Sequence, residues 1–300
     1  MSDKLALITG AAGGIGVELG RRLSRRGYRV IAVERNEMTA REAVRQIGDG
    51  AIAVACDLSD ATAVEAICAR VQGEWADGLE IVIANAGVIV PGDATQTTAQ
   101  DVDLELDVNL RSAMHLSAAA ARVMVARKRG HILATVSMGG IIAMPGSAVY
   151  SAGKAGLRAY LCALSCELRG TGVAVSGIYP SAVDTEMLYH EALGGGSMLN
   201  FVGKVSSIPE VADTYERALD GRKLEYYLPY GDSIGARVVQ SFPWLLPYLL
   251  GPLNKLGKRG FEKYLRKRQH SACADRLGGV DETDTAEDEL RRLAGPADRG

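Results

Sequence analysis

The sequence predicts an α/β fold in which helices cover both faces of a doubly wound parallel sheet. Short runs rich in valine and isoleucine recur along the chain, and segments of helical length separate them. The runs are continuously apolar, which is typical of parallel strands buried on both faces. Because crossovers between parallel strands are right-handed, this order winds into one sheet. The predicted strands are Leu5–Thr9, Arg29–Val33, Ile52–Cys56, Ile81–Ala84, His131–Ser137, Val173–Tyr179 and, most weakly, Tyr226–Pro229. Between them the helical period is clear, as in Val17–Arg26, where Leu19 and Leu23 lie on one side.

Composition narrows the class of protein. The chain has 300 residues, of which 47% are hydrophobic, so it can bury a core without disulfides or metal ions. Its net charge of -2 offers no general attraction for nucleic acid. The five cysteines form no CxxC pair and the four histidines show no metal-ligand spacing, so we expect reduced thiols and no metal site. The apolar run after Lys4 is too short for a signal peptide, which favours a cytoplasmic protein.

The C-terminal part of the chain differs in character from the rest. Residues 238–253 contain no charged side chain but three prolines. Residues 255–268 then carry seven basic residues and one acidic residue, and the chain becomes polar and acidic from Ser271 onward. We therefore expect a catalytic domain over 1–235, an apolar and basic helical extension over 236–270, and a disordered tail over 271–300.

The first predicted strand leads into a glycine-rich turn before a helix. The turn reads Thr9-Gly10-Ala11-Ala12-Gly13-Gly14-Ile15-Gly16. Glycines let the backbone approach a pyrophosphate, and a helix N-terminus attracts its negative charge. Such runs also occur in ordinary turns, but the place between a strand and a helix favours a phosphate site. We expect Gly10, Gly14, Ile15 and Gly16 to contact a dinucleotide.

Glu34 and Arg35 follow the second predicted strand and bear on the choice of cofactor. A carboxylate at this place accepts hydrogen bonds from the adenosine ribose and repels a 2′-phosphate. Arg35 argues the other way, because guanidinium is the natural partner of that phosphate. No basic residue lies in Gly10–Gly16 to provide a second phosphate contact. We therefore expect NAD rather than NADP, with a solvated surface pair as the plainer alternative for these two charges.

Tyr150 and Lys154 form the strongest local signal. Residues four apart share one face of a helix, and an ammonium beside a phenol lowers the tyrosine pKa toward the working range. A general acid/base for an alcohol and carbonyl pair has this property. Ser137, at the end of the fifth predicted strand, is placed to hold the substrate oxygen. By itself a Tyr-x3-Lys pair is usually a surface feature, so the surrounding motifs decide its meaning.

Together these motifs resemble the classical short-chain dehydrogenases/reductases. The shared residues are Thr9–Gly16, Asn85-Ala86-Gly87, Asn109, Ser137 and Tyr150-x3-Lys154, in the family's order and spacing over about residues 4–230. The resemblance implies an oxidoreductase with one Rossmann-like domain and a seven-stranded parallel sheet. It also implies hydride transfer between the substrate carbon and a nicotinamide cofactor.

The resemblance assigns roles to individual residues. Tyr150 would exchange a proton with the substrate oxygen, and Ser137 would steady that oxygen. Lys154 would lower the pKa of Tyr150 and bind the nicotinamide ribose, and Asn109 would hold a water that links Lys154 to solvent. The other implied cofactor contacts are Asp57 and Leu58 at the adenine, Asn85, Ala86 and Gly87 along the pocket, and Val183 and Thr185 at the carboxamide and pyrophosphate.

The segment after the sixth predicted strand bears on the substrate. Ser181 departs from the family, which usually has glycine after proline here; serine disfavours a positive φ, so we expect a slightly altered turn. The following loop, about 186–205, is rich in apolar side chains, and Met144 would line the same cleft. This composition favours a hydrophobic alcohol or ketone. No arginine or lysine lies between Glu186 and Gly203, which counts against small acidic substrates.

Two roles are open for the C-terminal extension. Val238–Leu253 is too short and too rich in proline to span a membrane. With the basic stretch it suits a peripheral contact with an anionic membrane through 238–268. Amphipathic segments more often pack against protein, so we favour packing over the active-site mouth or against another subunit. The resemblance implies a homodimer or homotetramer through the alanine-rich helices at His115–Ala126 and Tyr150–Leu168.

We therefore expect an enzyme that uses NAD(H) on a hydrophobic secondary alcohol or its ketone. The alternative among enzymes is an NADP-dependent 3-oxoacyl reductase, in which the basic stretch would receive an acyl carrier protein. The alternative outside enzymes is a non-catalytic dinucleotide-binding sensor, which would have no reason to keep Tyr150 together with Lys154.

Overall fold

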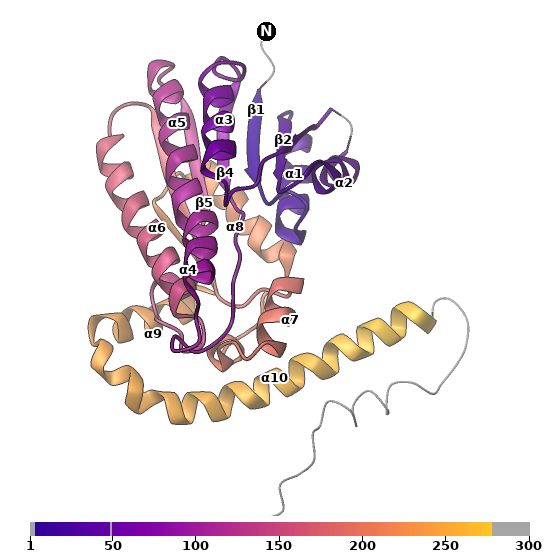
Figure 1. The fold of residues 1–300 in the computed structure, drawn as a ribbon, viewed down its shortest axis with the longest axis vertical. Helices are drawn as coiled ribbons and strands as arrows, with labels where there is room; N and C mark the ends of the chain where they lie inside the picture. Colours follow the sequence, from indigo (N-terminus) through magenta and orange to yellow (C-terminus); the bar gives the residue numbers. More distant parts are fainter. Residues whose placement is uncertain (1–3, 49, 278–300) are drawn as a thin grey trace, which may run out of the picture.

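The parallel sheet forms the centre of the molecule. The computed structural model describes residues 4–48 and 50–277 (Figure 1). Seven strands, all paired in parallel, follow the order β3-β2-β1-β4-β5-β6-β7, which confirms the predicted doubly wound α/β fold. The strands are β1 (Leu5–Thr9), β2 (Arg29–Glu34), β3 (Ile52–Ala55), β4 (Leu79–Ala84), β5 (Gly130–Thr135), β6 (Val173–Pro180) and β7 (Glu225–Leu228).

Helices cover both faces of this sheet and extend beyond it at the C-terminal end (Figure 1). They are α1 (Gly14–Arg25), α2 (Glu37–Ile47), α3 (Ala61–Gln72), α4 (Ala99–Leu106), α5 (Ser112–Ala126), α6 (Ala148–Glu167), α7 (Glu186–Leu193), α8 (Ile208–Gly221), α9 (Tyr230–Ser241) and α10 (Leu246–Leu277). Shorter turns are the π-helical η1 (Asp107–Arg111) and the 3-10 turns η2 (Met138–Gly140), η3 (Met198–Phe201) and η4 (Pro243–Leu245).

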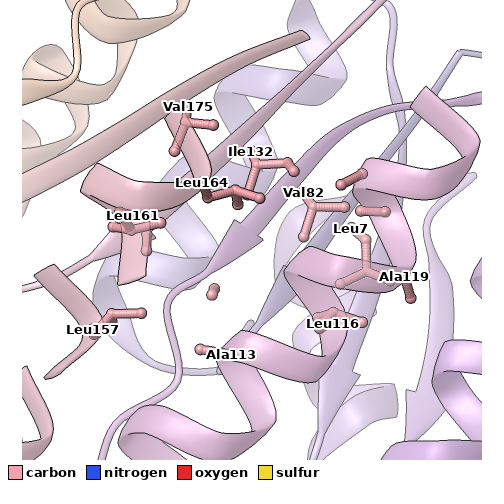
Figure 2. Close-up of a cluster of buried hydrophobic side chains, with 14 of the residues drawn as sticks. Leu7, Val82, Ala113, Leu116, Ala119, Ile132, Leu157, Leu161, Leu164 and Val175 are labelled. Carbon is pink, nitrogen blue, oxygen red and sulfur yellow. The ribbon is translucent and has the colours of Figure 1, made fainter. Parts of the chain in front are cut away.

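Neighbouring side chains of one strand enter two different cores. Leu7 belongs to a core with α3, α5 and α6, whereas Ile8 belongs to another with α1, α2 and α8. Figure 2 shows the first core, where Leu116 of α5 and Leu161 of α6 gather near strand residues such as Ile132. Burying one such leucine stabilises the fold by about 1.5–3 kcal/mol. Because the inner strands are buried on both faces, they are continuously apolar in the sequence.

The carboxyl ends of the strands meet at one edge of the sheet, and the functional residues follow these ends. β1 pairs with β2 on one side and with β4 on the other, so the chain winds away from β1 in two directions. Parallel sheets bind ligands in the crevice at such a switch point. The turn after β1 and the segment after β4 therefore lie side by side at the expected site.

The passage from α4 to α5 contains an irregular turn. Thr98 and Asp101 form a capping box that begins α4, and the π-helical turn η1 then replaces the regular helix before α5. Such turns shift the side chains that they carry and are frequent at functional sites. Here η1 carries Asn109, whose side chain is buried.

α9, η4 and α10 form a strap along the lower side of the molecule in Figure 1. α10 packs on η3 so closely that a β-carbon at Gly257 would collide with the Met198 carbonyl oxygen. A β-carbon at Gly260 would collide in the same way with Phe201. Phe201 and Tyr264 are buried together in a small core of their own. The strap thus holds the segment that follows α7.

The strap differs from the sequence prediction in two places, the boundary between 235 and 236 and the predicted start of the tail at residue 271. α9 continues through the expected boundary between 235 and 236, so the two parts share a helix. α10 ends at Leu277, so residues 271–277 are helical where the sequence predicts the start of a disordered tail. Alanine, arginine and leucine favour helix, and no glycine or proline interrupts the stretch before Gly278. The remainder of that predicted tail, 278–300, lies outside the described residues.

Among the helices described between residues 4 and 277, none combines the length and the apolar character that crossing a membrane requires.

Candidate active site

A cavity of about 860 Å³ opens at the carboxyl edge of the sheet. Every residue predicted to contact the cofactor lines it, and so does Ser137. These residues come from the turn after β1, the ends of β2 and β3, the segment after β4, the start of α6 and the loop after β6. Asn109 is the predicted site residue that does not line the cavity.

The glycine turn leaves no room for larger residues. Gly10 has φ +64°, and a β-carbon there would lie 2.9 Å from the Cα of Ala86. A β-carbon at Gly16 would collide with the Gly10 carbonyl oxygen, and one at Gly14 would meet Ile208 at 2.5 Å. α1 begins without a side-chain cap and has no acidic residue in its first turn. The N-terminus of α1 thus presents backbone N–H groups and the positive end of its dipole, which suits a pyrophosphate.

Glu34 is tied to the glycine turn by its carboxylate. One oxygen accepts a hydrogen bond from the backbone N–H of Ala12 at 2.7 Å, and the other accepts from the N–H of Arg35 at 3.2 Å. The Arg35 side chain is exposed. Hydrogen bonds from the Ser59 hydroxyl and backbone N–H lower the pKa of nearby Asp57, and Arg35 lowers it further. The end of the cavity beside β2 and β3 therefore has both acidic side chains, Glu34 and Asp57, and a basic one, Arg35.

Asn85 connects three strands beneath the cavity. Its side-chain amide donates to the carbonyl oxygens of Thr9 and Gly10, both at 3.2 Å. The Thr135 hydroxyl donates to its oxygen at 2.8 Å. The backbone N–H groups of Asn85 and Ala86 both donate to the Thr9 hydroxyl at 3.0 Å. The network holds the ends of β1, β4 and β5 in register.

Asn109 has both ends of its amide engaged. Its oxygen accepts from the backbone N–H of Val88 at 3.0 Å, and its nitrogen donates to the Val88 carbonyl at 2.7 Å. A β-carbon at Gly87 would lie 3.1 Å from the Asn109 oxygen and 3.5 Å from the ammonium of Lys154. Asn109 therefore holds the segment after β4 close to Lys154.

Ser137 lies beyond the end of β5 rather than within it. Its φ of 141° is rare for a residue with a side chain and indicates local backbone strain. Its hydroxyl accepts a hydrogen bond from the Gly139 N–H at 3.0 Å and so starts the turn η2. The sequence predicts a longer strand here because Val136 continues its apolar run as far as Ser137, but the strand ends at Thr135.

Lys154 is buried and lies beside Tyr150. Its ammonium donates to the Thr135 carbonyl at 2.9 Å and lies 5.6 Å from the centroid of the Tyr150 ring. Burial lowers the pKa of Lys154 to about 8. Burial also raises the pKa of Tyr150 to about 12, although its hydrogen bond with Ser137 acts in the opposite direction. The predicted lowering of the Tyr150 pKa is therefore wrong for the protein alone, because desolvation of the phenol outweighs its hydrogen bond with Ser137.

Two buried carboxyl groups near Tyr150 were not anticipated. Glu191 of α7 lines the cavity and accepts hydrogen bonds from the Ser147 hydroxyl at 3.2 Å and the Asn200 amide at 2.9 Å. Glu105 of α4 accepts from the Val90 N–H at 2.7 Å. Burial raises the pKa of Glu191 and of Glu105, and both groups act to raise that of Tyr150. Nothing in the local sequence marks either residue as buried.

The strap also contributes to the mouth of the cavity. Arg268 of α10 lines it and pairs with Glu186 and, at 3.5 Å, with Asp184. The Tyr264 hydroxyl donates to Asp184 at 2.9 Å. The sequence predicts no basic residue at this loop, because only packing brings α10 beside α7. The basic end of the extension thus reaches the active-site mouth, whereas Val238, Trp244 and Tyr248 of its apolar stretch, expected to pack there or against another subunit, are exposed.

The loop after β6 keeps an ordinary backbone at Ser181. Positive φ among the described non-glycine residues occurs at Lys128, Ser137 and Arg222 only. The Ser181 N–H donates to the Leu228 carbonyl at 2.7 Å, so β7 supports this turn. Ser181 therefore does not adopt the positive φ that serine disfavours.

The fold and the glycine-lined cavity define a dinucleotide-binding α/β oxidoreductase. The family model for short-chain dehydrogenases matches residues 4–192, and the chain belongs to that family. An uncharacterized short-chain type dehydrogenase/reductase of Sinorhizobium fredii is 34% identical over 192 residues, which are 64% of this chain and 74% of that relative.

Solved structures share the fold. A short-chain dehydrogenase from Sphingobium yanoikuyae in complex with NADPH has a TM-score of 0.69 and 23% identity, and the match covers 95% of this chain and 99% of that one. A metagenomic short-chain oxidoreductase in complex with NADP has a TM-score of 0.62 and 28% identity, with 76% and 97% covered.

Proposed function

We propose that this chain is an NAD-linked oxidoreductase that interconverts a hydrophobic secondary alcohol and its ketone, with Tyr150 as the general acid/base. The observation that carries the proposal is the meeting of Tyr150, Lys154 and Ser137 in one cavity with the glycine turn. The absence of room for a β-carbon at Gly14 and Gly16 and the uncapped start of α1 fit a dinucleotide pyrophosphate. When bound, the dinucleotide supplies the hydride that the substrate carbon gains or loses.

The site residues divide the remaining work. With a pKa of about 12, Tyr150 is protonated near neutral pH and donates its proton to the ketone oxygen during reduction. Ser137 holds that oxygen, and its strained backbone keeps the hydroxyl at the cavity. Lys154 stabilises the phenolate left behind and binds the nicotinamide ribose. Asn109 positions the segment that faces Lys154.

The lining of the cavity supports an apolar substrate. Leu104, Met144, Met187 and Leu188 line it on the side of α4 and α7. The carboxyl group of Glu191 is already engaged by Ser147 and Asn200, so it holds the α7 segment in place. Arg268 is likewise paired with acidic residues. The side chains on this side of the cavity therefore suit the surface of an apolar ketone, and the cation described beside α7, Arg268, is already paired and so is not free to bind a small acid.

Glu34 supports NAD over NADP, since a carboxylate at the end of β2 would accept hydrogen bonds from the adenosine ribose and repel a 2′-phosphate. Glu34→Gln tests this sharply, because the amide oxygen still accepts from Ala12 while the charge is gone. We expect the wild type to bind NADH more tightly than NADPH in fluorescence titrations. Glu34→Gln should then improve NADPH binding roughly fivefold to tenfold, the size of one weakly screened repulsion. Tighter NADPH binding by the wild type, weakened in Arg35→Ala, would instead favour the NADP-dependent 3-oxoacyl reductase.

The chemistry is tested with Tyr150→Phe and a series of ketones of increasing apolar bulk. Turnover should fall by about 100-fold or more, the usual contribution of a general acid, while NADH binding stays the same. Tyr160→Phe on the same helix is the matched control, because its hydroxyl bonds to the Met114 carbonyl away from the cavity. Cofactor binding with no turnover of any ketone, in wild type and variants alike, would favour the sensor.

A further inference from the structure

The outer side of the strap carries exposed aromatic and apolar side chains. Val238, Phe242, Trp244 and Tyr248, which we call the apolar patch, are 53%, 50%, 65% and 78% exposed. They lie on α9, η4 and the start of α10, at the lower end of the molecule in Figure 1. Scattered exposed apolar residues are normal, but a run of this kind marks a contact surface.

The same helix that begins in this patch continues into a basic face. Gly257, Phe261, Tyr264 and Arg268 recur every three or four residues and form the side of α10 that packs on the protein. Positions 248, 252, 255, 259 and 263 recur with the same period on the opposite side. Tyr248 of the patch and the cations Lys255, Arg259 and Lys263 therefore share one outward face.

The structure describes no acidic partner for these outward-facing cations between residues 4 and 277. Among the described side chains, no carboxylate pairs with Lys255, Lys258, Arg259, Lys263 or Lys267. The inward-facing Arg268, by contrast, pairs with Asp184 and Glu186. The basic face complements a partner whose outer layer is negatively charged. The aromatic patch complements an apolar layer directly beneath that outer layer.

We propose that the outward face of α9, η4 and α10 docks this protein on the surface of an anionic lipid bilayer. Tryptophan and tyrosine favour the level of the lipid headgroups, and lysine and arginine are attracted to anionic lipids. A second copy fits less well, because a two-fold contact pairs this surface with itself and so offers Lys255, Arg259 and Lys263 a surface that is itself basic and apolar. The apolar patch is a surface feature on a helix that lies along the protein, so docking is peripheral.

Because the strap borders the cavity, docking would bring the cavity close to apolar substrates in the bilayer, an inference that rests on the proposed function. The inner side of α10 contributes Arg268 to the mouth of the cavity and Tyr264 to the contact with Asp184. The outer side of the same helix would lie on the bilayer. An apolar ketone or alcohol dissolved in the lipid would then leave the bilayer close to the cavity.

Vesicle co-sedimentation of the full chain tests the docking without any use of activity. The wild type should sediment with vesicles of phosphatidylcholine and phosphatidylglycerol, fail to sediment with phosphatidylcholine alone, and dissociate at high salt. Lys255→Gln with Arg259→Gln should weaken binding about thirtyfold, since each cation contributes about a factor of five. Trp244→Ser with Tyr248→Ser should weaken it by about tenfold or more. Circular dichroism and NADH titration of each variant show that the fold is kept.

Matched controls lie on other faces of the protein. Met38→Ser removes an apolar side chain that is 74% exposed on α2, and Arg25→Gln with Arg169→Gln removes two exposed cations. These variants should bind vesicles like the wild type. Equal loss in the controls, or no binding to anionic vesicles, would overturn the proposal. If the patch variants instead change only the oligomeric state in sedimentation velocity, the face joins two copies of the chain and the lipid proposal fails. Ketone turnover without vesicle binding leaves the proposed function intact, which separates the two failures.

Discussion

The two sides of the cavity are built in different ways. On the cofactor side, the glycine turn and Asn85 directly follow strand ends, Glu34 is the last residue of β2, and the glycine turn lines the cavity. On the substrate side, α7 and η3 are held by a helix from the end of the chain, and Arg268 meets Glu186 across 82 residues. The difference teaches that cofactor binding is encoded locally, whereas the shape of the substrate side depends on long-range packing.

A pair of glycines turns this comparison into an experiment. Gly16 on the cofactor side and Gly257 on the substrate side both lie against a backbone carbonyl with no room for a methyl group. The largest effect is expected for Gly16→Ala, because the displaced turn also forms the phosphate site. Overpacking costs about 1–3 kcal/mol, so NADH binding should weaken about tenfold to a hundredfold in titrations. Gly235→Ala is the control, since nothing lies within 4 Å of a β-carbon there. NADH binding by Gly16→Ala equal to that of the wild type would break the comparison.

An effect of intermediate size is expected in the pH dependence of kcat/KM for ketone reduction. Lys154 is charged below its pKa of about 8 and loses its proton above it, whereas Tyr150 stays protonated up to about pH 12. The rate constant kcat/KM should therefore fall up to tenfold per pH unit above about pH 8. Lys154→Arg should move this fall to higher pH, because arginine keeps its charge. An alkaline fall that is unchanged in Lys154→Arg would assign it to another group.

The smallest effect is expected for Gly257→Ala. A methyl group there would push α10 away from Met198 and loosen the segment after α7. We expect KM for a bulky ketone to rise severalfold while NADH affinity is unchanged, as measured by steady-state kinetics and titration. Gly251→Ala, where a β-carbon meets nothing within 4 Å, should match the wild type. A loss of NADH affinity in Gly257→Ala would show that the two sides are not independent.

The cofactor side was predictable because its signals are contiguous in the chain. The glycine turn, Glu34 and the spacing of Tyr150 and Lys154 are visible within single elements, and each predicted contact lines the cavity. Predictions from the sequence were wrong where a property depends on tertiary burial or on the path of the backbone. Lysine four residues from tyrosine indicates a lowered tyrosine pKa, yet the dry surroundings of Tyr150 raise it. Ser137 follows an apolar run that predicts a strand, but it lies in a strained turn beyond the end of β5.

Local pattern was therefore enough to establish the order of strands and helices, the glycine turn and the pairing of Tyr150 with Lys154. These features depend on the period of apolar residues and on backbone freedom, which neighbouring residues set. Tertiary structure decided the burial of Glu191 and Glu105, the approach of Arg268 to the cavity and the outward face of the strap. Such features depend on which distant surfaces exclude water together, and no short stretch of the chain contains that information.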